Sequence, residues 1–148
     1  MLCTTAGSTA ARQLKALALN PHSGPIFALM KTLLSPTKTY RLNGRLWLET
    51  EDGRFLGIGR LELLEHIAAL GSISKAAQAM GMSYKRAWDL VSSMNAQAAT
   101  PLVSTQTGGT RGGGAAVTEA GHEAIAAFSA LQARFQAFMT VETEAIQP

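Results

Sequence analysis

The chain has 148 residues, a hydrophobic fraction of 47% and a net charge of +3, values typical of one globular domain with its own core. Its single cysteine, Cys3, excludes an internal disulfide framework and a cysteine-rich zinc site, and it fits a reducing compartment. The longest apolar runs, such as "PIFALM", fall far short of the roughly 20 residues that span a bilayer, so we expect a cytoplasmic protein.

The positive charge is unevenly distributed along the chain. Residues 1–48 carry +6 and no acidic residue, whereas the remaining residues sum to −3. Within residues 72–114, four basic residues stand against one acidic residue, Asp89. A local basic excess of this size permits contact with nucleic acid without requiring it.

Residues 1–39 are rich in Ser, Thr and Pro and contain two short apolar patches, "LKALAL" and "FALMKTLL". We predict a poorly specified N-terminal tail for this segment. A basic targeting peptide is the alternative, and the natural start could also lie at Met30.

A β-hairpin followed by a core helix is predicted next. Residues 40–58 alternate apolar and polar side chains on either side of the turn signal "EDG", the pattern of a hairpin. From Arg60 onward, leucine and isoleucine recur at helical spacing up to Leu70. The "GIGR" between the two lacks the third glycine of a dinucleotide-binding loop.

Residues 71–97 predict two helices joined by a tight turn. Gly71 ends the preceding helix, and Ser72 or Ser74 can cap a short helix with Ile73, Ala76, Ala77 and Met80 at its inner positions. Gly81 can supply the positive φ of a sharp turn before Ser83 caps the next helix. This is the helix-turn-helix arrangement, in which the second helix enters the DNA major groove.

The second of these helices has two distinct faces. Ala87, Val91 and Met94 fall on one side, which predicts the core face. The opposite side and its flanks carry side chains that donate to phosphates or guanine, or accept from cytosine, and a solvated surface helix is the alternative. With the capping serine and the arginine of the following loop, the candidate DNA-contacting residues are Ser83, Tyr84, Lys85, Arg86, Trp88, Asp89, Ser92 and Arg111.

A wing is predicted after the helix-turn-helix. The pattern indicates a strand over 102–105, a glycine-rich tip that contains Arg111, and a second strand over 115–117. The tip sequence "GGTRGGG" could also indicate a phosphate-binding loop, but no Gly-Lys-Ser/Thr follows it. A wing tip that brings Arg111 to the DNA backbone or the minor groove explains the composition better.

The last predicted helix begins at Thr118, with Glu119 in its first turn. Its apolar residues repeat at spacings of four and three, the pattern of a heptad seam. Such a seam either packs internally or pairs with a second copy, and we favour a homodimer. The candidate dimerisation residues are Phe128, Leu131, Phe135 and Phe138.

These motifs together resemble a known family. "GSISKAAQAMGMSYKRAWDLVSSMN" followed by "TGGTRGGGAAVTEAG" is similar to the N-terminal winged-helix domain of the molybdate-responsive ModE regulators, over residues 56–139. The more distant LysR-type helix-turn-helix shares the fold without the Ala87-Trp88-Asp89 sequence. Full-length members carry oxyanion-binding modules after this domain, whereas this chain ends at Pro148, so it resembles a DNA-binding-only form in which direct molybdate binding is not expected.

The predicted fold is mainly α with small β-hairpins: a winged helix-turn-helix over 40–139 that includes a long C-terminal dimerisation helix, then a tail over 140–148. The predicted function is a dimeric regulator that binds double-stranded DNA at a palindromic operator. A winged-helix module for protein contacts is the alternative. His22, His66 and His122 are widely separated and lack a catalytic arrangement, so we expect no enzyme, no catalytic residues, no metal and no cofactor.

Overall fold

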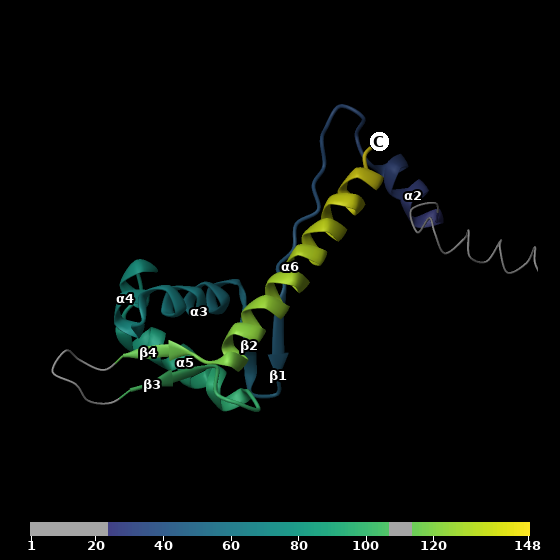
Figure 1. Cartoon of the computed structure of the whole chain (residues 1–148). Helices are drawn as coiled ribbons and strands as arrows, with labels where there is room; N and C mark the ends of the chain where they lie inside the picture. Colours follow the sequence, from purple (N-terminus) through teal and green to yellow (C-terminus); the bar gives the residue numbers. More distant parts are fainter. Residues whose placement is uncertain (1–23, 107–113) are drawn as a thin grey trace, which may run out of the picture. The chain divides into compact units, whose positions relative to one another are not determined.

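The computed structural model describes residues 24–106 and 114–148 (Figure 1). The chain divides into two compact units. Residues 45–136 form the larger unit, and the smaller unit combines the N-terminal segment up to residue 44 with residues 137–148. No helix among the described residues is both long and apolar enough to cross a membrane.

The larger unit has the element order of a winged helix-turn-helix domain. A hairpin precedes three helices, a second hairpin follows them, and a long helix begins at its end (Figure 1). The elements are β1 (Trp47–Thr50), β2 (Gly53–Gly57), α3 (Ile58–Leu70), α4 (Ile73–Ala79), α5 (Tyr84–Gln97), β3 (Val103–Thr105), β4 (Ala115–Val117) and α6 (Glu119–Ala145). The predicted fold class is therefore confirmed.

The core of this unit lies where α3, α4 and α5 pack together. Leu63, Leu64, Ile67 and Met94 are its largest fully buried side chains. Alanines at the inner positions of α4 are also buried, and small side chains allow close helix packing. Leu70, the last residue of the predicted apolar stripe of α3, is exposed.

The first hairpin is shorter than predicted. Its strands pair in antiparallel register from Trp47 opposite Gly57 to Thr50 opposite Gly53, and α3 begins at Ile58 rather than Arg60. The backbone before β1 is bonded elsewhere: the Leu42 N–H donates to Thr143 Oγ1 and the Tyr40 N–H to Gln147 Oε1. These donors are satisfied by side chains of the C-terminal segment, so residues 40–46 form no strand.

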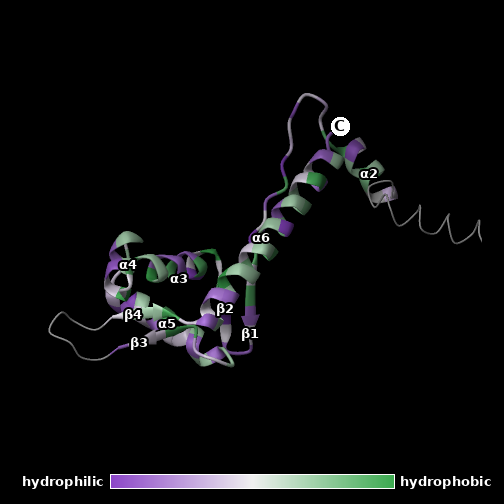
Figure 2. Cartoon of the chain, in the orientation of Figure 1, coloured by the Kyte–Doolittle hydropathy of each residue, from purple (hydrophilic) through white to green (hydrophobic). Residues whose placement is uncertain are grey.

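The smaller unit contains a helix inside the predicted N-terminal tail. Helix α2 (Pro25–Leu33) starts with Pro25 at its first turn, where the missing N–H of proline has no cost. At the other end of the chain, α6 continues to Ala145, beyond residue 139, because neither Gly nor Pro occurs between Gly121 and Pro148. Hydrophobic and hydrophilic residues alternate along α6 (Figure 2).

Candidate nucleic-acid interface

The turn between α4 and α5 fixes the start of the candidate reading helix. Gly81 has φ = +64°, a left-handed conformation that glycine adopts without strain. The next residue, Met82, donates its N–H to the Ala77 carbonyl at 3.0 Å. Ser83 then caps α5, because its Oγ accepts the Arg86 N–H at 3.2 Å. Both predicted local signals, the glycine turn and the serine cap, are confirmed.

Helix α5 has one buried face and one exposed face. Ala87, Val91 and Met94 are buried in the core, as predicted. On the opposite face, Lys85 Nζ lies 2.8 Å from Asp89 Oδ2 in an exposed ion pair. Such surface pairs contribute only about 0.3–0.5 kcal/mol, so both groups can exchange this partner for a phosphate or a base edge. The exposed candidates on α5 and its cap are Ser83, Tyr84, Lys85, Arg86, Trp88, Asp89 and Ser92.

An aromatic pair lies on the flank of α5 that faces the wing. The rings of Tyr84 and Trp88 stack with centroids 6.3 Å apart and an interplanar angle of 27°, and the two residues are 55% and 40% exposed. Trp88 thus stacks within its own helix. Both rings line a hollow of about 430 Å³ that also borders Ser72 and Thr105. Flat apolar surface therefore lies directly beside the polar face of α5.

The base of the wing is held by Asn95, a residue that the sequence pattern did not single out. Its Nδ2 donates to the Val103 carbonyl at 2.8 Å, while its Oδ1 accepts the N–H groups of Leu102 and Val103 at 2.8 and 3.1 Å. On the other strand, the Ala115 N–H donates to the Gly71 carbonyl at 3.0 Å. These bonds attach the wing to α5 and to the end of α3.

Strand β3 begins at Val103, one residue later than predicted. The Leu102 carbonyl accepts the Thr118 N–H across the hairpin at 3.0 Å, but the Leu102 N–H is bonded to the side chain of Asn95, so the regular strand pairing starts at Val103. The strand over 115–117 is confirmed. The predicted wing-tip residue Arg111 lies outside the described residues.

A close contact connects the wing to the first turn of α6. Thr118 Oγ1 donates to the Pro101 carbonyl at 2.7 Å and accepts the Gly121 N–H at 3.1 Å. Gly121 is buried, and a Cβ added there would collide with the Leu102 carbonyl and the Val117 side chain. The sequence showed the Thr118 cap, but nothing in it distinguished Gly121 from an ordinary helix glycine.

The predicted dimerisation residues do not form one exposed stripe. Phe128 is only 3% exposed and belongs to the core of its own chain, which corrects its assignment to a dimer seam. Phe135 is partly buried. Leu131 and Phe138 remain 43% and 56% exposed. The heptad spacing could not separate these cases, because internal packing and dimer packing use the same period.

Among the described residues, no group of three or more His, Cys, Asp and Glu side chains could hold a metal ion. The fold and these side chains define a class: a winged helix-turn-helix domain in which a wing flanks the polar, exposed face of α5. Residues 58–122 match the model of the bacterial regulatory helix-turn-helix proteins of the lysR family.

Comparison with individual curated proteins specifies the type of helix-turn-helix domain. The chain is 41% identical over 96 residues to a molybdenum transport protein ModE of Azotobacter vinelandii, covering 65% of the chain and 36% of that protein. It is 42% identical over 86 residues to the DNA-binding transcriptional dual regulator ModE of Escherichia coli, covering 58% and 33%. A molybdenum-pterin-binding protein MopB of Rhodobacter capsulatus is 48% identical over 81 residues, covering 55% and 30%.

The chain thus has a helix-turn-helix domain of the ModE type, as its motifs indicated. It spans about a third of the length of the curated relatives that it matches.

Proposed function

We propose that the protein is a transcription regulator that binds double-stranded DNA through α5 and the wing. The observation that carries this proposal is the exposed face of α5, where Lys85, Asp89 and Ser92 lie opposite a fully buried face. These side chains project from the helix that follows the helix-turn-helix glycine, the position that enters the major groove in such domains.

The exposed residues fall into two groups by chemistry. Lys85 and Arg86 can bind phosphates or donate to guanine, whereas Asp89 can accept from cytosine N4. On the wing side, the sequence between β3 and β4 supplies Arg111, which we expect to contact the DNA backbone or the minor groove. The relative in Escherichia coli is described as a DNA-binding transcriptional dual regulator, which supports the same activity here.

We further propose that the protein binds a palindromic operator as a homodimer. Exposed apolar residues on α6, among them Leu131 and Phe138, provide surface that pairing with a second copy would bury. A two-fold dimer presents two copies of α5 to two half-sites, which is how helix-turn-helix dimers read symmetric operators.

Selection from a random pool of DNA duplexes tests the proposal directly. We expect enrichment of a symmetric sequence, and we expect Lys85→Ala to weaken binding to it. Arg134→Ala is the matched control, because it removes the same charge from an exposed position on α6. If no sequence is enriched, the winged fold serves protein contacts instead. If both variants weaken binding equally, DNA is held by general charge attraction and not by α5.

A further inference from the structure

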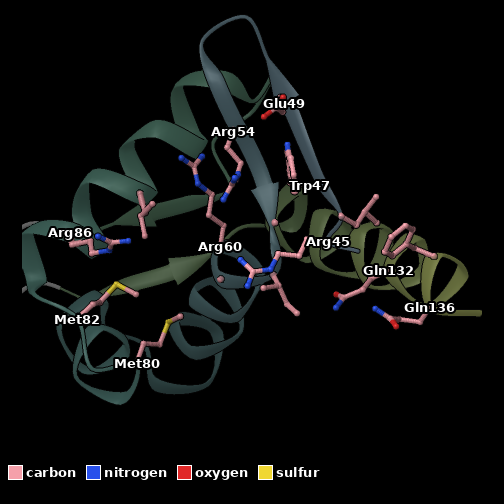
Figure 3. A pocket seen from close by; sticks show the side chains of 16 residues that line it. Arg45, Trp47, Glu49, Arg54, Arg60, Met80, Met82, Arg86, Gln132 and Gln136 are labelled. Atoms are coloured by element: carbon pink, nitrogen blue, oxygen red, sulfur yellow. The ribbon is translucent and has the colours of Figure 1, made fainter. Parts of the chain in front are cut away.

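The far flank of α5, away from the wing, borders a second and larger hollow of about 1000 Å³. Four arginines line it from different parts of the domain: Arg45 before β1, Arg54 on β2, Arg60 on α3 and Arg86 on α5 (Figure 3). Among the described residues that line it, Glu49 is the only carboxylate. The hollow therefore has a strong positive charge.

Ion pairs among the described residues do not offset the charge of these arginines. None of the four arginines forms an ion pair with a carboxylate of the described residues. Arg54 instead stacks over Trp47, with its Cζ 5.0 Å from the ring centroid, and Arg60 donates to the Phe55 carbonyl at 3.2 Å. Burial, together with the neighbouring Arg54, lowers the pKa of Arg60. An anion bound between Arg54 and Arg60 would relieve this repulsion.

The size and the walls of the hollow indicate what kind of anion fits. Pockets for organic ligands span roughly 300–1,000 Å³, so the hollow is far larger than one tetrahedral oxyanion needs. Part of its wall is apolar and includes Leu46, Met80 and Leu90. Guanidinium groups bind phosphate oxygens in a planar, two-pronged geometry, and Glu49 can accept hydrogen bonds from hydroxyl or amino groups.

We propose that this hollow binds a small organic molecule carrying two or more phosphate groups. Arg54 and Arg60 hold a phosphate group at its centre, and the apolar wall contacts the organic part. Arg86 and Leu90 reach the same ligand from α5, one turn apart. A ligand phosphate that binds Arg86 competes with a DNA phosphate for the same guanidinium, so occupancy lowers DNA affinity. This last consequence rests on the proposed DNA-binding function, whereas ligand binding itself does not.

Isothermal titration with ATP, without DNA and without divalent cations, tests the site. We expect saturable one-site binding to the wild-type protein and at least tenfold weaker binding of inorganic tripolyphosphate, which cannot use the apolar wall. Arg54→Gln should weaken ATP binding by about tenfold or more, the value of one charge-assisted hydrogen bond. Arg60→Met removes the second guanidinium group at the centre of the hollow and should likewise weaken ATP binding. Arg134→Ala removes an equal charge outside the lining and should leave ATP binding unchanged.

Three results would overturn the proposal: no saturable ATP binding, equal affinity for tripolyphosphate, or equal weakening in Arg134→Ala. The last two would show general attraction to a basic surface. Electrophoretic mobility shifts with the selected operator then measure how ATP binding changes the DNA affinity. ATP at a concentration that fills the wild-type site but not the weakened site of Arg54→Gln should lower the DNA affinity of the wild type and leave that of the variant nearly unchanged. A protein that binds ATP but no DNA would refute only the proposed regulator function.

Discussion

Replacing Gly121 with alanine should destabilise the domain, although alanine favours helices. A Cβ at this position collides with the Leu102 carbonyl and the Val117 side chain. The first obstacle is backbone, held in place by the Thr118 N–H and by Asn95, so it cannot move aside as a flexible side chain would. Overpacking of this kind costs about 1–3 kcal/mol, more than the roughly 1 kcal/mol that Gly→Ala contributes inside a helix.

Gly59→Ala provides the matched control for this substitution. Gly59 also lies in a helix, α3, but a Cβ there meets nothing within 4 Å. Its replacement should therefore stabilise the protein by up to about 1 kcal/mol. Urea unfolding followed by circular dichroism would measure both variants, with opposite shifts of the midpoint expected. If Gly121→Ala unfolds at the wild-type midpoint or above it, α6 does not approach Leu102 as closely as described.

Four further predictions concern the wing, the DNA, the dimer and the effector. Asn95→Ala leaves the Leu102 and Val103 N–H groups and the Val103 carbonyl without their partner, so the free energy of unfolding should fall by about 1–3 kcal/mol; unfolding at the wild-type midpoint would show that water replaces these bonds. DNA binding should weaken with salt by a log-log slope of about −0.9 per phosphate contact, and Arg111→Ala should reduce affinity across all sequences and flatten that slope by about one contact per subunit; a changed sequence preference would show that the wing reads bases. Leu131→Glu with Phe138→Glu should convert the dimer to a monomer in light scattering, because a carboxylate in a desolvated seam costs several kcal/mol; a wild-type monomer at micromolar concentration would contradict the dimer. Titration with molybdate, with sulfate as control, should show no specific binding in the micromolar range, and saturable binding that sulfate cannot mimic would refute this expectation.

The fold of the larger unit could be predicted because its main signals are local. Ser83 caps α5 and Gly81 turns the chain for reasons that act within a few residues. The exposed face of α5 could be predicted in the same way. The buried positions Ala87, Val91 and Met94 determine which side of the helix faces the core, and therefore which side faces the solvent. Periodicity and caps therefore determined which side chains of α5 face the solvent.

Other features of the fold depend on contacts between segments that are far apart in the sequence. Local sequence patterns do not predict those contacts. Phe128 has the same heptad spacing as Leu131, yet one is buried in its own core and the other is exposed. The roles of Asn95 and Gly121 depend on Leu102, which lies against both.

The sequence by itself determined the helix-turn-helix, its caps and the polar face of α5, because hydrogen bonds and side-chain periods within one helix set them. The tertiary structure alone decided how the wing is attached and which apolar residues stay exposed. It also placed four arginines, Arg45, Arg54, Arg60 and Arg86, around one hollow. Those outcomes depend on contacts between residues far apart in the chain, whose geometry exists only after the core has packed.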